Sequence, residues 1–162
     1  MVDEISEECG VIGVWGHENA SRIAAMGLFA MQHRGQESSG VAACDGKEVR
    51  LVRQMGLVAR LTEYMQEHGE PAGHAAIGHV RYSTAGSSNL TNAQPLLIRH
   101  KRGPLSIAHN GNLYNAKELR RQLEEMGHIF QSTSDTETIF HLTARHPSPS
   151  LEEAIKAALH QV

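Results

Sequence analysis

The hydrophobic pattern of this 162-residue chain changes character near His109. Before that residue, short apolar runs, bounded by Gly, Pro or polar residues, predict β-strands with two helices among them. After it, polar start signals that precede amphipathic segments predict three helices. This order favours a layered α/β or α+β domain over a regular alternation of strand and helix.

The first part of the chain predicts strands at residues 9–16, 40–44, 49–54, 75–81, 95–100 and 105–109. Asp45-Gly46 lies between two of them and is typical of a hairpin turn. A helix is expected after Asn19 or Ser21, and because its apolar residues lie nearly all round, we expect it to be largely buried. A second, shorter helix is expected at Leu57–Glu67.

Three helix starts in the last part resemble capping boxes, in which a polar residue is followed three positions later by Glu. These pairs are Asn115 with Glu118, Ser134 with Glu137, and Ser150 with Glu153. Gly127 stands where the first of these helices should end.

Composition excludes several classes of protein. The net charge of −3 provides no basic surface for nucleic acid. No apolar stretch is long enough for a membrane span, and the acidic start lacks a secretory pattern. Two cysteines are too few for a disulfide framework, so we expect free thiols and a cytoplasmic protein. The histidines have no metal-ligand spacing, so no metal site is expected.

A few polar residues near the predicted strand ends could together carry chemistry. They are Cys9, Arg81, the Asn110-Gly111 pair and Asp135, which could supply a nucleophile, oxyanion donors and a clamp for a zwitterionic amino acid. Each also has a structural interpretation. Cys9 could be a small buried hydrophobic residue, Asn110-Gly111 a turn, Asp135 a helix cap and Arg81 an ion-pair partner.

Five sequence blocks resemble the class II glutamine amidotransferases, which are N-terminal-nucleophile hydrolases. The blocks are residues 8–13 (ECGVIG), 32–38 (QHRGQES), 78–86 (GHVRYSTAG), 108–113 (AHNGNL) and 133–137 (TSDTE). Gln36-Glu37 after His-Arg-Gly is similar to the amidophosphoribosyltransferase family, whereas glucosamine-6-phosphate synthases have Tyr-Asp and asparagine synthetases Pro-Asp. Val80-Arg81-Tyr82 likewise differs from the Thr-Arg-Trp of the sugar enzymes.

The resemblance implies an α+β fold, a four-layer αββα sandwich of the N-terminal-nucleophile hydrolase type that is C-terminally incomplete in this chain. It implies that residues 1–8 form a leader removed on maturation and that residues 9–162 form the glutaminase domain. A phosphoribosyltransferase domain would then lie outside this chain. Magnesium and, in some relatives, an iron–sulfur cluster would belong to that missing part, with no cofactor in this chain.

The resemblance also implies the role of each site residue. Cys9 would be the nucleophile, with Asn110 and Gly111 holding the oxyanion. Arg81 would bind the α-carboxylate of glutamine and Asp135 its α-ammonium. Two further residues would assist, namely Thr84 with a hydrogen bond to the substrate and Arg34 around the nucleophile.

The implied reaction releases ammonia from glutamine and passes it to phosphoribosyl pyrophosphate, giving phosphoribosylamine in the first step of purine synthesis. The complete protein would be a homo-oligomer without nucleic acid or membrane partners. Two alternatives stay open: the glutaminase domain of another class II amidotransferase, and an inactive fragment that still carries its leader.

Overall fold

An antiparallel sheet in the order β1–β4–β2–β3 is the larger sheet of the computed structural model, which describes residues 9–82 and 89–162. Its strands are β1 (Gly10–Trp15), β2 (Ser38–Cys44), β3 (Val49–Met55) and β4 (Ala75–Arg81). The sequence predicts all four strands, and β2 and β3 form the predicted hairpin. Asp45 closes its turn, because one carboxylate oxygen accepts the N–H groups of Lys47 and Glu48 at 3.0 and 2.9 Å.

Strand β4 lies between β1 and β2, and this placement brings distant parts of the chain together. Gly10 is opposite Val80 in one ladder, and Ser38 is opposite Arg81 in the other. The start of β1, the start of β2 and the end of β4 therefore meet at one end of the sheet.

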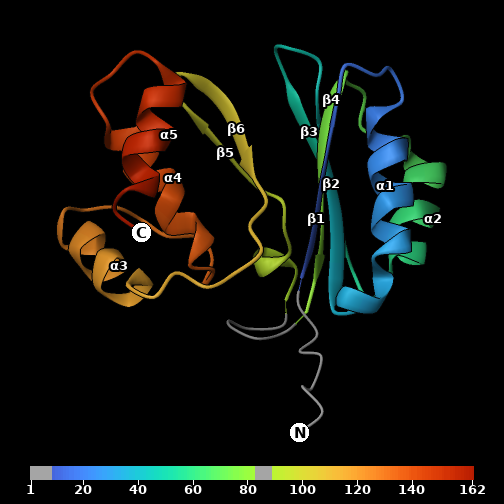
Figure 1. Cartoon of the computed structure of the whole chain (residues 1–162), viewed down its shortest axis with the longest axis horizontal. Coiled ribbons are helices and arrows are strands. Elements are labelled where there is room, and N and C mark those ends of the chain that lie inside the picture. The colour runs from blue at the N-terminus through green and yellow to red at the C-terminus, as the bar shows by residue number, and fades with distance from the viewer. Residues whose placement is uncertain (1–8, 83–88) are drawn as a thin grey trace, which may run out of the picture.

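Helices α1 (Ala20–Ala30) and α2 (Val58–His68) cover one face of this sheet (Figure 1). α1 packs through a face of small residues and one leucine, namely Ala20, Ser21, Ala24, Ala25 and Leu28. The three alanines and the leucine of this face form the main core with Val41, Val58, Leu61 and Val80, so the apolar interior lies between these helices and the sheet.

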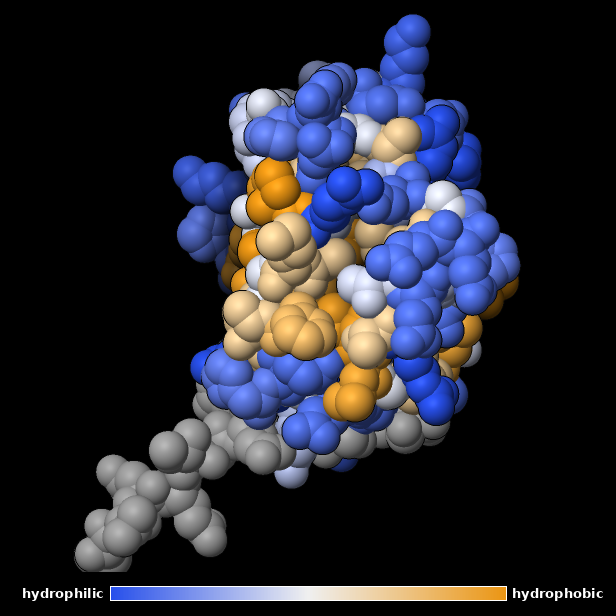
Figure 2. Space-filling model, turned by 90° about the vertical axis from the view of Figure 1, so that its right-hand side faces the viewer, coloured by the Kyte–Doolittle hydropathy of each residue, from blue (hydrophilic) through white to orange (hydrophobic). Residues whose placement is uncertain are grey.

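The expectation that α1 is largely buried is wrong. Met26 and Phe29 are 67% and 62% exposed, because they project from the side of the helix that faces away from the sheet. Figure 2 shows hydrophobic side chains gathered on this outward side of α1 and α2. The apolar residues that encircle α1 thus form a core face and a surface face.

A second, two-stranded sheet pairs β5 (Leu96–His100) with β6 (Gly103–Ile107). β6 begins two residues earlier than predicted, since Gly103 and Pro104 pair with His100 and Arg99 instead of forming a longer turn. In Figure 1 this hairpin lies on the side of the larger sheet opposite α1 and α2.

The chain ends in three helices: α3 (Ala116–Glu125), α4 (Thr136–Arg145) and α5 (Leu151–Leu159). The stop at Gly127 is confirmed by its φ of +89°, directly after the residue that caps α3. Figure 1 shows α4 and α5 beside β5 and β6, on the side away from the larger sheet. No helix within the described ranges is long and apolar enough to cross a membrane.

Only one predicted cap forms as expected, at Ser150, whose hydroxyl accepts the N–H of Glu153 at 3.3 Å. The prediction for Asn115 is wrong, because its side-chain amide donates to the carbonyl of Gln161 instead of capping α3. The prediction for Ser134 is also wrong: Asp135 precedes α4, and Glu137 binds the N–H groups of residues 131 and 132.

Candidate active site

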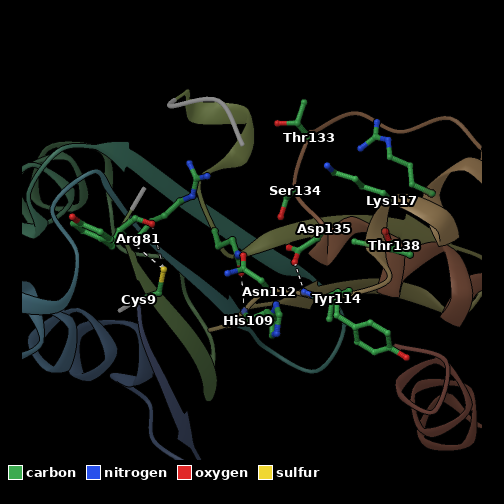
Figure 3. Close-up of a pocket in the computed structure, with 16 residues that line it drawn as sticks. Cys9, Arg81, His109, Asn112, Tyr114, Lys117, Thr133, Ser134, Asp135 and Thr138 are labelled. Carbon is green, nitrogen blue, oxygen red and sulfur yellow. Dashed lines mark hydrogen bonds between the residues drawn. The ribbon is translucent and has the colours of Figure 1, made fainter. Parts of the chain in front are cut away.

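A cavity of about 510 Å³ opens at the end of the larger sheet where β1 starts and β4 ends. Its volume falls within the range of small-molecule sites. Its wall comes from the starts of β1, α3 and α4, the end of β4 and the segment after β6 (Figure 3). The lining includes Cys9, Arg81, Tyr82, Gln94, His109, Gly111, Leu113, Tyr114, Lys117, Arg120, Ser134, Asp135 and Thr138.

Cys9 lies immediately before β1, and its sulfur faces the main chain that leaves β4. The backbone N–H of Tyr82 donates to Sγ at 3.3 Å, and the thiol lies 3.7 Å from the Tyr82 carbonyl oxygen. The guanidinium of Arg34 donates to the Cys9 carbonyl at 3.2 Å. Cys9 is partly exposed and lines the cavity, so its thiol is fixed but accessible.

Arg81, the last residue of β4, is 6% exposed and forms an ion pair with Glu37 at 2.5 Å. The backbone N–H of Glu37 also donates to the Arg81 carbonyl at 3.0 Å. Gly35 packs directly on the Arg81 backbone, where an added Cβ would lie 2.6 Å from its carbonyl carbon. The segment at residues 35–37 therefore fixes Arg81 by both its main chain and its side chain.

Asp135 faces the same cavity from the start of α4, and Figure 3 shows its carboxylate directed toward the segment before Tyr114. One carboxylate oxygen accepts the Leu113 N–H at 2.7 Å, and the other lies 3.3 Å from the Thr136 hydroxyl. The Asp135 side chain makes no capping hydrogen bond to α4, so the alternative of a simple helix cap does not hold.

His79 lies behind the cavity wall on β4 and is fully buried. Burial lowers the pKa of its imidazole to about 4, since the charged form would be desolvated there. Its Nε2 is 3.2 Å from the carbonyl oxygen of His109. A carbonyl oxygen can only accept a hydrogen bond, so the neutral ring must carry its proton on Nε2, and His79 donates to His109.

The structure brings four predicted site residues, Cys9, Arg81, Gly111 and Asp135, to one cavity. Asn110 is exposed beside Gly111 and does not line the cavity. Thr84 lies outside the described residues. Arg34 contacts the main chain of Cys9, consistent with a place around the nucleophile.

Several cavity residues were not anticipated from the sequence. Gln94 and His109 belong to this set, as do Lys117 and Arg120 from α3. The helical spacing of the last two residues could have placed them on one side of α3, but no local signal ties that side to Cys9. Within the described ranges, His, Cys, Asp and Glu form no cluster that could hold a metal ion.

The chain is similar to proteins of one kind in both sequence and structure. A family model described as a glutamine amidotransferase domain matches residues 63–154. The amidophosphoribosyltransferase of Bacillus subtilis is 48% identical over 158 residues, which are 96% of this chain and 33% of that protein. The amidophosphoribosyltransferase of Lacticaseibacillus casei is 47% identical over 158 residues, covering 98% of this chain and 81% of that protein.

Two solved structures are similar over 93% of this chain. One is described as the allosteric regulatory enzyme of purine biosynthesis, with a TM-score of 0.87 and 45% identity. The other is glutamine phosphoribosylpyrophosphate amidotransferase from Bacillus subtilis in complex with ADP and GMP, with a TM-score of 0.83 and 44% identity. The chain spans 32% of either one and is a mixed α+β domain like the corresponding part.

Proposed function

Because this chain is a glutamine amidotransferase domain that belongs to the amidophosphoribosyltransferase family, we propose that it releases ammonia from the side-chain amide of glutamine. The observation that carries this proposal is one cavity that holds an accessible thiol, a cation and an anion: Cys9, Arg81 and Asp135. Glutamine has an electrophilic carboxamide, an α-carboxylate and an α-ammonium, so these three groups match its three functional parts.

Cys9 is the proposed nucleophile and becomes effective when it is the first residue. An ordinary thiol has a pKa of about 8.5 and is mostly protonated at neutral pH. A free α-amine on the same residue has a pKa of about 8 and can take the thiol proton, directly or through water. While Glu8 is attached, that nitrogen is an amide without basicity, so removal of residues 1–8 would activate the thiol.

The Tyr82 N–H supports this role, because a backbone donor 3.3 Å from Sγ stabilises a thiolate more than a thiol. The hydrogen bond from Arg34 to the Cys9 carbonyl would keep Cys9 in place after the peptide bond between Glu8 and Cys9 is cleaved. Arg34 is therefore a supporting residue behind the nucleophile in this proposal, and it does not contact the substrate.

Attack of the thiolate on the carboxamide carbon forms an S–C bond and a tetrahedral oxyanion. We assign the oxyanion donors to the Asn110 side chain and the Gly111 N–H, and one such donor typically contributes about 2.7–4 kcal/mol to the transition state. Collapse breaks the C–N bond, and the leaving nitrogen takes the proton held by the α-amine. Water then hydrolyses the thioester to glutamate and regenerates the thiol.

Opposite charges would hold the amino-acid end of glutamine. Arg81 would bind the α-carboxylate through its guanidinium, whose planar fork suits two carboxylate oxygens. Asp135 would bind the α-ammonium and keep its contact with Leu113, because a carboxylate accepts several hydrogen bonds. Thr84 would add a hydrogen bond to the substrate.

The remaining steps belong to parts of the protein beyond this chain. There, ammonia would displace pyrophosphate from phosphoribosyl pyrophosphate, with magnesium and, in some relatives, an iron–sulfur cluster bound in the same part. The complete protein would be a cytoplasmic homo-oligomer. The four-layer αββα sandwich is part of this proposal, and the observed order of helices, larger sheet, β5–β6 hairpin and helices supports it (Figure 1).

The decisive comparison pairs Cys9→Ser with Cys44→Ser in the complete protein. Glutamine hydrolysis should fall to background in Cys9→Ser, whereas phosphoribosylamine formation from added ammonia should persist. Cys44→Ser is the matched control and should keep both activities, because Cys44 is at the far end of β2 from the cavity. Glutamine hydrolysis by Cys9→Ser at the unsubstituted rate would refute the proposed function.

A further inference from the structure

His109 is held at its N–H, its carbonyl and its ring by side chains from three separate parts of the chain. Its backbone N–H donates to Oε1 of Gln94 at 2.7 Å. Its carbonyl accepts Nε2–H of His79 at 3.2 Å. Its ring Nδ1 lies 3.3 Å from the hydroxyl of Thr136. We call this set, His79, Gln94 and Thr136, the His109 clamp.

The clamp is buried although all its members are polar. His79 and Thr136 are fully buried, and Gln94 is 7% exposed. Desolvating polar side chains is costly unless their hydrogen bonds are made, and a partner that loses its bond there retains that cost. Gln94 is further tied to Thr136, at 3.4 Å between Nε2 and Oγ1. The clamp therefore fixes His109 more firmly than exposed contacts could.

The position of His109 determines where the next residues lie. Gly111 packs over the His109 ring, since an added Cβ would lie 3.2 Å from ring Nε2, and it adopts a φ of +143°. Figure 3 shows His109 at the cavity wall beside Asn112 and Tyr114. The His109 carbonyl that accepts the His79 N–H belongs to the same peptide group as the Asn110 nitrogen. The two residues that carry the proposed oxyanion donors, Asn110 and Gly111, thus come immediately after a fixed residue in the chain.

We propose that His79 and Gln94 are positioning residues that fix, through the backbone of His109, the segment that carries the proposed oxyanion donors, Asn110 and Gly111. This inference rests on the proposed function. His79 lies behind the cavity wall and Gln94 lines the cavity, and in this inference each acts through the backbone of His109. The burial that keeps the His79 ring neutral supports the role, because a neutral ring has one N–H and the carbonyl receives it.

The oxyanion forms only when the thiol attacks. Misplaced donors therefore stabilise the transition state less and leave substrate binding unchanged. The clamp thus predicts an effect on kcat without an effect on KM. His79→Leu keeps the bulk of the ring but removes the donor, whereas His79→Gln keeps a side-chain N–H. Gln94→Met removes the acceptor for the His109 N–H at similar size.

The test measures glutamine hydrolysis by the complete protein in these variants. We expect His79→Leu and Gln94→Met to lower kcat about tenfold or more, with KM within about twofold of the unsubstituted value. His79→Gln should recover most of the lost kcat. His68→Leu, an exposed histidine at the end of α2, is the matched control and should change neither parameter.

Thermal melting of each variant separates positioning from loss of fold. A variant that melts like the unsubstituted protein yet has a lower kcat supports the clamp. Unchanged kcat in both His79→Leu and Gln94→Met would overturn this inference alone, as would equal losses in His79→Leu and His79→Gln. Absence of glutamine hydrolysis in the unsubstituted protein would instead overturn the proposed function.

Discussion

Arg81 shows how a single residue can be both buried and charged. Transferring a cation from water to the protein interior costs several kcal/mol, which a well-placed partner must offset. Glu37 supplies that partner at 2.5 Å, and its own side chain is only 10% exposed. Arg81 is therefore an ion-pair partner, as its structural interpretation predicts, and it also lines the cavity.

Replacing Arg81 with lysine tests its proposed contact with substrate. Lysine keeps the positive charge beside Glu37 but cannot present two parallel N–H groups to a carboxylate. We expect KM for glutamine to rise about tenfold or more, the equivalent of roughly 1.4 kcal/mol or more, with little change in kcat. Steady-state kinetics of the complete protein measure this change, and an unaltered KM would remove Arg81 from substrate binding.

At the scale of elements, α1 divides its apolar residues between the core and the surface. Leu28 is fully buried against the sheet, whereas Phe29 is 62% exposed on the outward side of the same helix. Leu28→Ala should lower the free energy of unfolding by about 2–5 kcal/mol, because it leaves a cavity. Chemical denaturation measures this loss, and Phe29→Ala is the matched control.

Phe29→Ala should change the free energy of unfolding by only about 0.5 kcal/mol, since surface substitutions rarely have larger effects. If Phe29→Ala destabilised the protein as much as Leu28→Ala, the orientation of α1 described above would be wrong.

A buried carboxylate ties α4 to the segment before it. Glu137 accepts the N–H groups of Gln131 and Ser132, both at 2.7 Å, and the Ser132 hydroxyl. Burial alone would raise the pKa of Glu137, but the nearby His141 imidazole, 3.7 Å away, and the hydrogen bonds from Ser132 and the backbone together lower it to about 2. Glu137 therefore serves as an anchor for residues 131–132.

The lowered pKa of Glu137 predicts how stability depends on pH. A carboxyl whose pKa falls from 4.5 to about 2 on folding stabilises the fold above about pH 4.5. This contribution, roughly 3 kcal/mol, is lost as the pH falls through about 2. The difference in unfolding free energy between the unsubstituted protein and Glu137→Gln should narrow between about pH 5 and pH 2. A constant difference across this range would contradict the assigned pKa.

Local sequence signals predicted an element well where the residues that stabilise it are close together in the sequence. The β2–β3 hairpin follows from Asp45-Gly46, because the turn and its hydrogen bonds lie within a few residues. The caps at Asn115 and Ser134 failed for the opposite reason. Gln161 engages Asn115, and the segment at 131–132 engages Glu137, and neither partner can be read from the helix start itself.

At the scale of the whole molecule, the cavity depends on pairing between distant segments. The blocks around Cys9 and Arg81 are far apart in sequence and meet only because β4 pairs with β1. The resemblance anticipated that such blocks form one site, but the residue pattern alone could not. Gln94 and His79 escaped prediction because a buried polar residue has no sequence signature without knowledge of its partner.

The central claim is that Cys9 attacks the carboxamide of glutamine in this cavity. Diazo-oxo-norleucine, a reactive glutamine analogue, tests it in complete protein whose first residue mass spectrometry has identified as Cys9. Peptide mass spectrometry should locate one adduct on Cys9 and none on Cys44, and excess glutamine should slow its formation. An adduct on Cys44 instead, or labelling of Cys9 that glutamine does not slow, would contradict the account.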